Sequence, residues 1–115
     1  MSNPEPAQNL FARPLELPQL LSVQSQAIVS RILVKHPSGS ITLFAFDEGQ
    51  SVEEHTAPFD AMIHVLEGEA EVSIAGEWHL VRAGEAILLP ANVPHAIRAP
   101  KAFKMVLVML RRPSQ

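Results

Sequence analysis

The segment that decides the fold is Gly49–Gly68, with the sequence GQSVEEHTAPFDAMIHVLEG. Its second half, residues 61–66, is a short apolar run that predicts a β-strand ended by a turn at Gly68. Its first half predicts a loop that carries His55, because Pro58 interrupts regular strand pairing just beyond the histidine. The segment therefore predicts a strand that is entered through a histidine-bearing loop.

A second stretch, GEAILLPANVPH at residues 84–95, has a similar organisation. It begins with a glycine, continues into an apolar strand at residues 86–89, and delivers His95 after two prolines. Two glycine-led strand segments, each supplying one histidine, can bring both side chains into one pocket. We therefore expect His55 and His95 to face the same interior.

Outward from these two stretches, short apolar or alternating runs continue along the chain. The remaining predicted strands are residues 27–35, 41–47, 69–74, 78–81, 95–99 and 103–110. Short strands at intervals of about 8–12 residues, separated by Gly, Pro or Asn, are typical of an all-β sandwich or barrel.

The chain before the first strand has a different character, because it is polar and rich in proline. We expect residues 1–9 to be poorly ordered. Pro14 and Pro18 prevent a long helix, but residues 17–21 can form one turn as a short cap over the barrel. The predicted organisation is a tail and cap over residues 1–25 and a barrel domain over residues 26–112.

Composition excludes several classes of function. The 115 residues include no cysteine, which removes disulfides, thiolate catalysis and sulfur-ligated zinc. A net charge of −3 gives no basis for nucleic-acid binding. The longest apolar run, residues 105–110, is far shorter than the roughly 20 residues that a membrane helix needs. The N-terminus lacks the pattern of a secretory signal, so we expect no membrane association and a cytoplasmic protein.

The same apolar run, Met105–Leu110, indicates a strand with both faces covered. One face would meet the barrel core. The other face, with Val106, Val108 and Leu110, must meet another layer or another chain. This is the first indication of a homodimer.

The two stretches together resemble the two motifs of the cupin superfamily. Gly49, five residues, His55 and a strand ending in Leu-Glu-Gly resemble the first motif. Gly84, five residues, Pro90, four residues and His95 resemble the second. The resemblance covers about residues 40–110 and implies a small jelly-roll barrel, also called a double-stranded β-helix, that usually forms homodimers. It also implies a metal site with four protein ligands.

The chain departs from that ligand set. Ala57 and Ala61 stand where the family has a second histidine and a glutamate, so the resemblance leaves His55 and His95 as the metal ligands. A first-row divalent metal (Fe, Mn, Ni or Zn) would need water, a substrate oxygen or an unconventional side chain to complete its coordination. The nearest carboxylate, Asp60, should face the other side of its strand.

What replaces the ligands is small and apolar, and aromatic residues lie nearby. Phe59, Phe44, Phe103 and Met105 are candidates to line the barrel. Such a pocket with two imidazoles suits an organic anion or an aromatic molecule. The alternative is a filled core, in which the aromatic side chains pack together and the histidines are hydrogen-bonded. The family's motif also has a glycine and a late asparagine where this chain has Asn92 and Ala99.

The other histidines are weaker candidates. His64 should face away from the pocket because it is three residues beyond Ala61, His79 should be exposed, and His36 should sit in a turn. No residue can be assigned a catalytic or cofactor-binding role, because no carboxylate has the spacing to orient either pocket histidine.

Three functional hypotheses follow. The leading one is a small homodimeric cupin that binds a small molecule, a weakly held divalent metal, or both, in its barrel. The second is a metal-dependent cupin enzyme, of the dioxygenase or isomerase type, whose substrate completes the coordination. The third is a non-catalytic regulatory or structural module.

Overall fold

The regular secondary structure of the chain is almost entirely β-strand. The structure is a computed structural model and describes residues 10–112. The elements are the 3-10 helix η2 (Leu17–Leu20) and the strands β1 (Ile28–His36), β2 (Gly39–Phe46), β3 (Ser51–His55), β4 (Phe59–Glu67), β5 (Glu69–Ile74), β6 (Glu77–Arg82), β7 (Ala86–Leu89), β8 (His95–Arg98) and β9 (Phe103–Arg111). The all-β prediction is confirmed, and η2 is the single turn expected near residues 17–21. The expectation for residues 1–9 lies outside the described residues.

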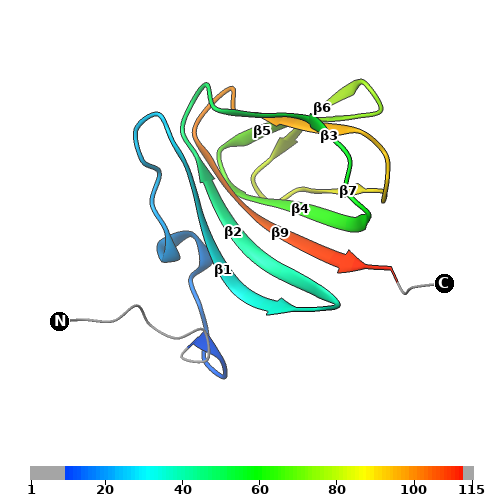
Figure 1. Cartoon of the computed structure of the whole chain (residues 1–115). Helices are drawn as coiled ribbons and strands as arrows, with labels where there is room; N and C mark the ends of the chain where they lie inside the picture. The colour runs from blue at the N-terminus through cyan, green and yellow to red at the C-terminus, as the bar shows by residue number, and fades with distance from the viewer. Residues whose placement is uncertain (1–9, 113–115) are drawn as a thin grey trace.

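The strands form two antiparallel sheets that face each other as a jelly-roll barrel (Figure 1). The larger sheet has the order β1-β2-β9-β4-β7 and the smaller has the order β3-β8-β5-β6. Strands that are distant in sequence are therefore neighbours: β9 lies between β2 and β4, and β8 lies between β3 and β5. No helix among residues 10–112 has the length and apolar character that crossing a membrane requires.

The main core lies between the two sheets. Phe46 of β2 and Phe103 of β9 stack with ring centroids 4.5 Å apart. Ile63 and Val65 of β4 and Val72 of β5 are fully buried beside them. Because each strand alternates its side chains between two faces, the same strands present a second set of residues on the outside of the barrel.

A second apolar cluster covers part of the outer face of the larger sheet. Leu10 and Leu21, from the segment that precedes β1, pack with Leu43 and Val106. Figure 1 shows this segment on the outer side of β1 and β2. The layer that we expected over β9 is therefore supplied in part by the chain itself, whereas Leu110, near the end of the strand, remains 61% exposed.

Two basic side chains attach this N-terminal layer to the barrel. Lys104 of β9 donates to the backbone carbonyl of Pro18 at 2.7 Å. Arg31 of β1 donates to the carbonyl of Leu20 at 3.0 Å. Lys104 also lies 3.5 Å from Glu67, and its side chain is 14% exposed. Two carbonyls of the 3-10 helix are therefore satisfied by side chains of the sheet that it covers.

One local prediction was wrong. The segment before His55 was expected to be a loop, but residues 51–55 form β3, an edge strand of the smaller sheet. Its sequence, SVEEH, has one apolar residue, and four of its five residues are exposed, so it lacks the apolar pattern that marks a buried strand. Pairing with β8 makes it a strand. Likewise His36, expected in a turn, is the last residue of β1.

Candidate functional site

A bulge in β3 directs His55 into the barrel. Val52 pairs with Ile97 of β8, and His55 pairs with His95, so three steps along β3 match two steps along β8. Regular alternation would place Val52 and His55 on opposite faces, because they are three residues apart. The extra residue restores the common face, as bulges do when they re-aim a side chain. Both residues line the same cavity.

His95 starts β8 and lies beside His55. Their ring centroids are 4.4 Å apart in an edge-to-face arrangement. His95 is 8% exposed, whereas His55 is exposed at the mouth of the cavity. Burial lowers the pKa of His95 below its ordinary 6.5; the carbonyl of Val93 opposes this effect, and the neighbouring His55 adds to the lowering.

Each imidazole is oriented by a carbonyl of its own segment. Nδ1 of His55 lies 2.9 Å from the carbonyl oxygen of Glu53, within the bulge. Nδ1 of His95 lies 3.2 Å from the carbonyl oxygen of Val93. Because a carbonyl oxygen only accepts hydrogen bonds, Nδ1 is the donor in both rings. The bulge and the turn before β8 thus favour the same tautomer in the two rings, with the hydrogen on Nδ1.

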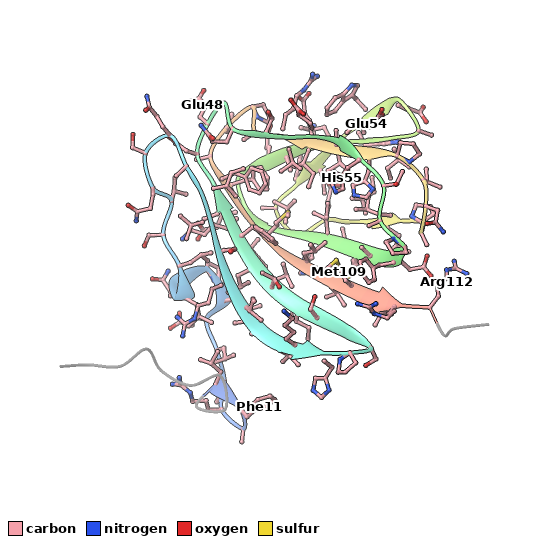
Figure 2. The ribbon with its side chains drawn as sticks, viewed as in Figure 1. Phe11, Glu48, Glu54, His55, Met109 and Arg112 are labelled. Carbon is pink, nitrogen blue, oxygen red and sulfur yellow. The ribbon has the colours of Figure 1, made fainter. Side chains whose placement is uncertain are left out.

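The cavity between the two sheets has a volume of about 230 Å³. Its lining comes from both sheets: Phe44, Phe46, Val52, His55, Ala57, Phe59, Ala61, Ile63, Leu89, His95, Ile97, Met105, Leu107 and Met109. Figure 2 shows His55 on β3 and Met109 on β9 on opposite sides of the barrel interior. Among these lining residues the histidines are the polar ones, so the cavity is an apolar chamber with paired imidazoles at one end.

The 230 Å³ cavity is lined by most of the residues that the sequence predicted to line the barrel. Phe44, Phe59 and Met105 line it as expected, and Ala57 and Ala61 face it beside the histidines. Phe103 and Ala99 do not; both are buried in the core instead. The structure therefore has a cavity where the filled-core alternative expects packed side chains, although both histidines are hydrogen-bonded as that alternative expects.

The lining residues that the sequence reasoning missed include Leu107 and Met109 of β9. The signal was available, because they lie two and four residues beyond Met105 and therefore share its face. Met109 is directly opposite Ala61 in the β4–β9 register. The thioether side chain thus lies beside the position where the family has its glutamate.

The loop before β4 and the turn before β8 are joined at the mouth of the cavity. The backbone N–H of Asn92 donates to the carbonyl of Ala57 at 2.8 Å. Asn92 has a φ of 66°, in the left-handed region where asparagine is among the best tolerated residues after glycine. The replacement of the family's glycine by asparagine therefore keeps the turn.

Asp60 faces away from the histidines, as strand alternation predicted. Its carboxylate accepts from the backbone N–H of Ala91 at 3.0 Å and from Arg112 at 3.1 Å. The hydrogen bond from Ala91, followed by the one from Arg112, lowers the pKa of Asp60 below 3.8. This carboxylate is engaged outside the barrel and supplies no ligand to the interior.

The side chains present do not fit a resident metal centre. Such centres use three or four protein ligands, and residues 10–112 contain no group of three His, Cys, Asp or Glu side chains placed to hold an ion. His55 and His95 supply two nitrogens, while Ala57 and Ala61 supply none. The role of the two histidines as metal ligands stays a prediction.

The remaining histidines lie outside the cavity. His64 pairs with Val106 and Ala86 on the outer face of the larger sheet. The side chain of His79 is 41% exposed and lies 3.9 Å from Glu77. Neither approaches the pair formed by His55 and His95.

The fold and site together define a small jelly-roll protein with an internal, histidine-bearing cavity. The cupin domain family matches residues 42–110, more than half of the chain. The chain belongs to the cupin family.

Solved structures agree with this assignment. A conserved protein of unknown function from Streptococcus pyogenes is 38% identical, with 90% of each chain covered and a TM-score of 0.85. A cupin 2 conserved barrel domain protein from Leptotrichia buccalis is 37% identical over 84% of this chain and 47% of its own, with a TM-score of 0.82.

A relative with a more specific name is the polyketide synthase CurC from Streptomyces cyaneus. It is 27% identical over 74 residues, which cover 64% of this chain and 48% of CurC. This chain therefore matches about half the length of that relative.

Proposed function

We propose that the barrel binds a small, largely apolar organic molecule, with one end of the molecule against His55 and His95. The observation that carries this proposal is the 230 Å³ cavity, whose walls are apolar except for the two imidazoles. Cavities of this composition, with a few convergent polar groups, are the usual form of small-molecule sites.

The volume limits the size of the ligand. An apolar cavity of about 150 Å³ is large enough to bind benzene. A cavity of 230 Å³ therefore suits a molecule with one ring or a short branched chain. Fused multi-ring compounds would require the barrel to open.

A metal-dependent enzyme is the competing hypothesis. Two neutral imidazoles with unbonded Nε2 atoms are chemically suited to a weakly held divalent ion, but the bound molecule would have to supply the other ligands. Metal analysis of protein purified without chelator separates the hypotheses. Binding without chemistry predicts substoichiometric metal and unchanged ligand affinity after chelation.

We also propose that the chain forms a homodimer through the outer face of the larger sheet. The N-terminal layer covers Val106, but Leu88 is 70% and Leu110 is 61% exposed. Together with Met62 and Val108 they line a shallow apolar depression across β4, β7 and β9. An exposed apolar surface of this kind is typical of a protein interface.

The direct test of the cavity uses toluene as a probe, followed by backbone amide NMR on chelator-treated protein. We expect saturable shifts at residues that line the cavity. Ala61→Leu, which adds bulk inside the cavity, should abolish them, while Met62→Leu, at the neighbouring outward-facing position, should not. Saturable shifts confined to the outer surface, or none, would contradict the proposal.

A further inference from the structure

The tautomers of His55 and His95 determine what the cavity offers to a ligand. Both Nδ1 atoms are within hydrogen-bond distance of backbone carbonyls, 2.9 Å from Glu53 and 3.2 Å from Val93. Each Nδ1 must therefore carry the hydrogen, because the carbonyl oxygen can only accept. In a neutral imidazole the other nitrogen, Nε2, is then a hydrogen-bond acceptor.

The two rings cannot both be charged at low cost. Their centroids are 4.4 Å apart, and the cavity walls beside them are apolar. Two positive charges at this separation repel each other, and the burial of His95 adds to the cost of charging both rings. At least one ring therefore keeps an acceptor Nε2, and the neutral pair keeps two.

The rest of the cavity offers no stronger hydrogen-bonding group. Every other lining side chain is aliphatic, aromatic or a methionine, whose sulfur is itself a weak acceptor. While both imidazoles are neutral, a carbonyl or carboxylate that enters this chamber would meet acceptors and apolar walls. Its oxygen atoms would then lose their water without gaining a donor.

We infer that the ligand has an apolar body of about one ring that carries a hydroxyl group of the phenol or enol type. This hydroxyl donates a hydrogen bond to Nε2 of an imidazole. This inference rests on the proposed small-molecule function and specifies the chemistry of the ligand. This ligand differs from the organic anion that the sequence suggested. The backbone carbonyls hold the hydrogen on Nδ1 of each ring, so the Nε2 atoms that face a ligand are acceptors rather than donors.

The test compares phenol, toluene and benzaldehyde as probes on chelator-treated protein, with affinities measured by NMR titration. In the wild type we expect phenol to bind at least as tightly as toluene, and benzaldehyde to bind more weakly than phenol. Replacing both histidines, His55→Leu with His95→Leu, should lower the phenol-to-toluene affinity ratio about tenfold, because the hydroxyl loses its partner. His64→Leu, on the outer face, should leave the ratio unchanged.

Several outcomes would overturn the inference. One is an unchanged ratio in the double variant, and another is preferential binding of benzaldehyde by the wild type. A wild-type measurement guards against misfolding of the variant: imidazole ¹⁵N shifts should show hydrogen on Nδ1 of both rings, and the opposite tautomer would refute the inference. Toluene that fails to bind at all would contradict the proposed function as well, so the two failures are distinguishable.

Discussion

His55 and His95 are cross-strand partners on β3 and β8, and their rings meet edge to face at 4.4 Å. The pairing depends on the extra residue in β3 between Val52 and His55. Without that bulge, strand alternation would turn one of the two β3 side chains outward. The site is therefore a product of strand register as much as of residue identity.

The stability of the protein should depend on the protonation of His95. Burial lowers the pKa of His95 below 6.5 in the folded state, so the unfolded chain binds more protons as the pH falls below this value. The free energy of unfolding should be highest above about pH 6.5 and should decline toward the lowered pKa. Urea unfolding between pH 8 and pH 5 measures this decline in the free energy of unfolding. The wild type and its histidine variants are compared at each pH.

The matched variants assign that pH dependence to one residue. His95→Gln should flatten the decline, whereas His79→Gln, at an exposed position, should leave it as in the wild type. An equally steep decline in His95→Gln would show that other groups cause it.

Restoring the family's ligands should create a metal site. Ala57 and Ala61 line the same cavity as His55 and His95, so Ala57→His with Ala61→Glu would place four ligand side chains around one space. We expect the double variant to bind about one equivalent of Mn²⁺ or Zn²⁺ by calorimetry, and to lose that binding when His95→Ala is added. Uptake that persists without His95 would mean that the ion binds elsewhere.

Gly68 should be intolerant of any side chain. A Cβ there would clash with the carbonyl oxygen of Ala102 and lie 2.9 Å from the Cα of Phe103, and φ is +77°. Gly68→Ala should therefore cost more than about 2 kcal/mol in unfolding free energy. Gly76 has a similar φ of +84° with nothing within 4 Å, so Gly76→Ala isolates the backbone term of about 1 kcal/mol. Equal costs for the two variants would contradict the predicted clash.

Lys104 should stabilise the N-terminal layer. Its ammonium group donates to the carbonyl of Pro18 at 2.7 Å from a largely buried position. Lys104→Met should lower the unfolding free energy by about 1–2 kcal/mol and increase hydrogen exchange before β1. Lys101→Met is the control, because Lys101 is 69% exposed and lies 3.8 Å from Glu69. A cap that exchanges at the wild-type rate in Lys104→Met would refute this role.

The predicted dimer should depend on the apolar depression of the outer face. Leu88→Glu should shift the protein to monomers in sedimentation velocity experiments, because it places a charge on the most exposed apolar residue of that surface. Leu80→Glu, on the smaller sheet, should leave the assembly unchanged. A wild-type protein that sediments as a monomer at micromolar concentration would exclude this interface.

Local patterning was enough to predict most strands. Residues 69–74 and 86–89 coincide with β5 and β7, because their apolar residues and flanking turns lie within a few positions of each other. β3 was missed because its residues are polar and exposed, and its strand conformation comes from hydrogen bonds to β8, about forty residues further along the chain.

The sequence by itself determined the alternation of faces within each strand, the positions of the two histidines and the loss of the ligands at Ala57 and Ala61. The tertiary structure decided that His55 faces inward, that Met109 lies opposite Ala61, and that the N-terminal segment covers Val106. The physical reason is that alternation is a property of the local backbone, whereas register, bulges and layer packing depend on pairing between segments that are distant in sequence.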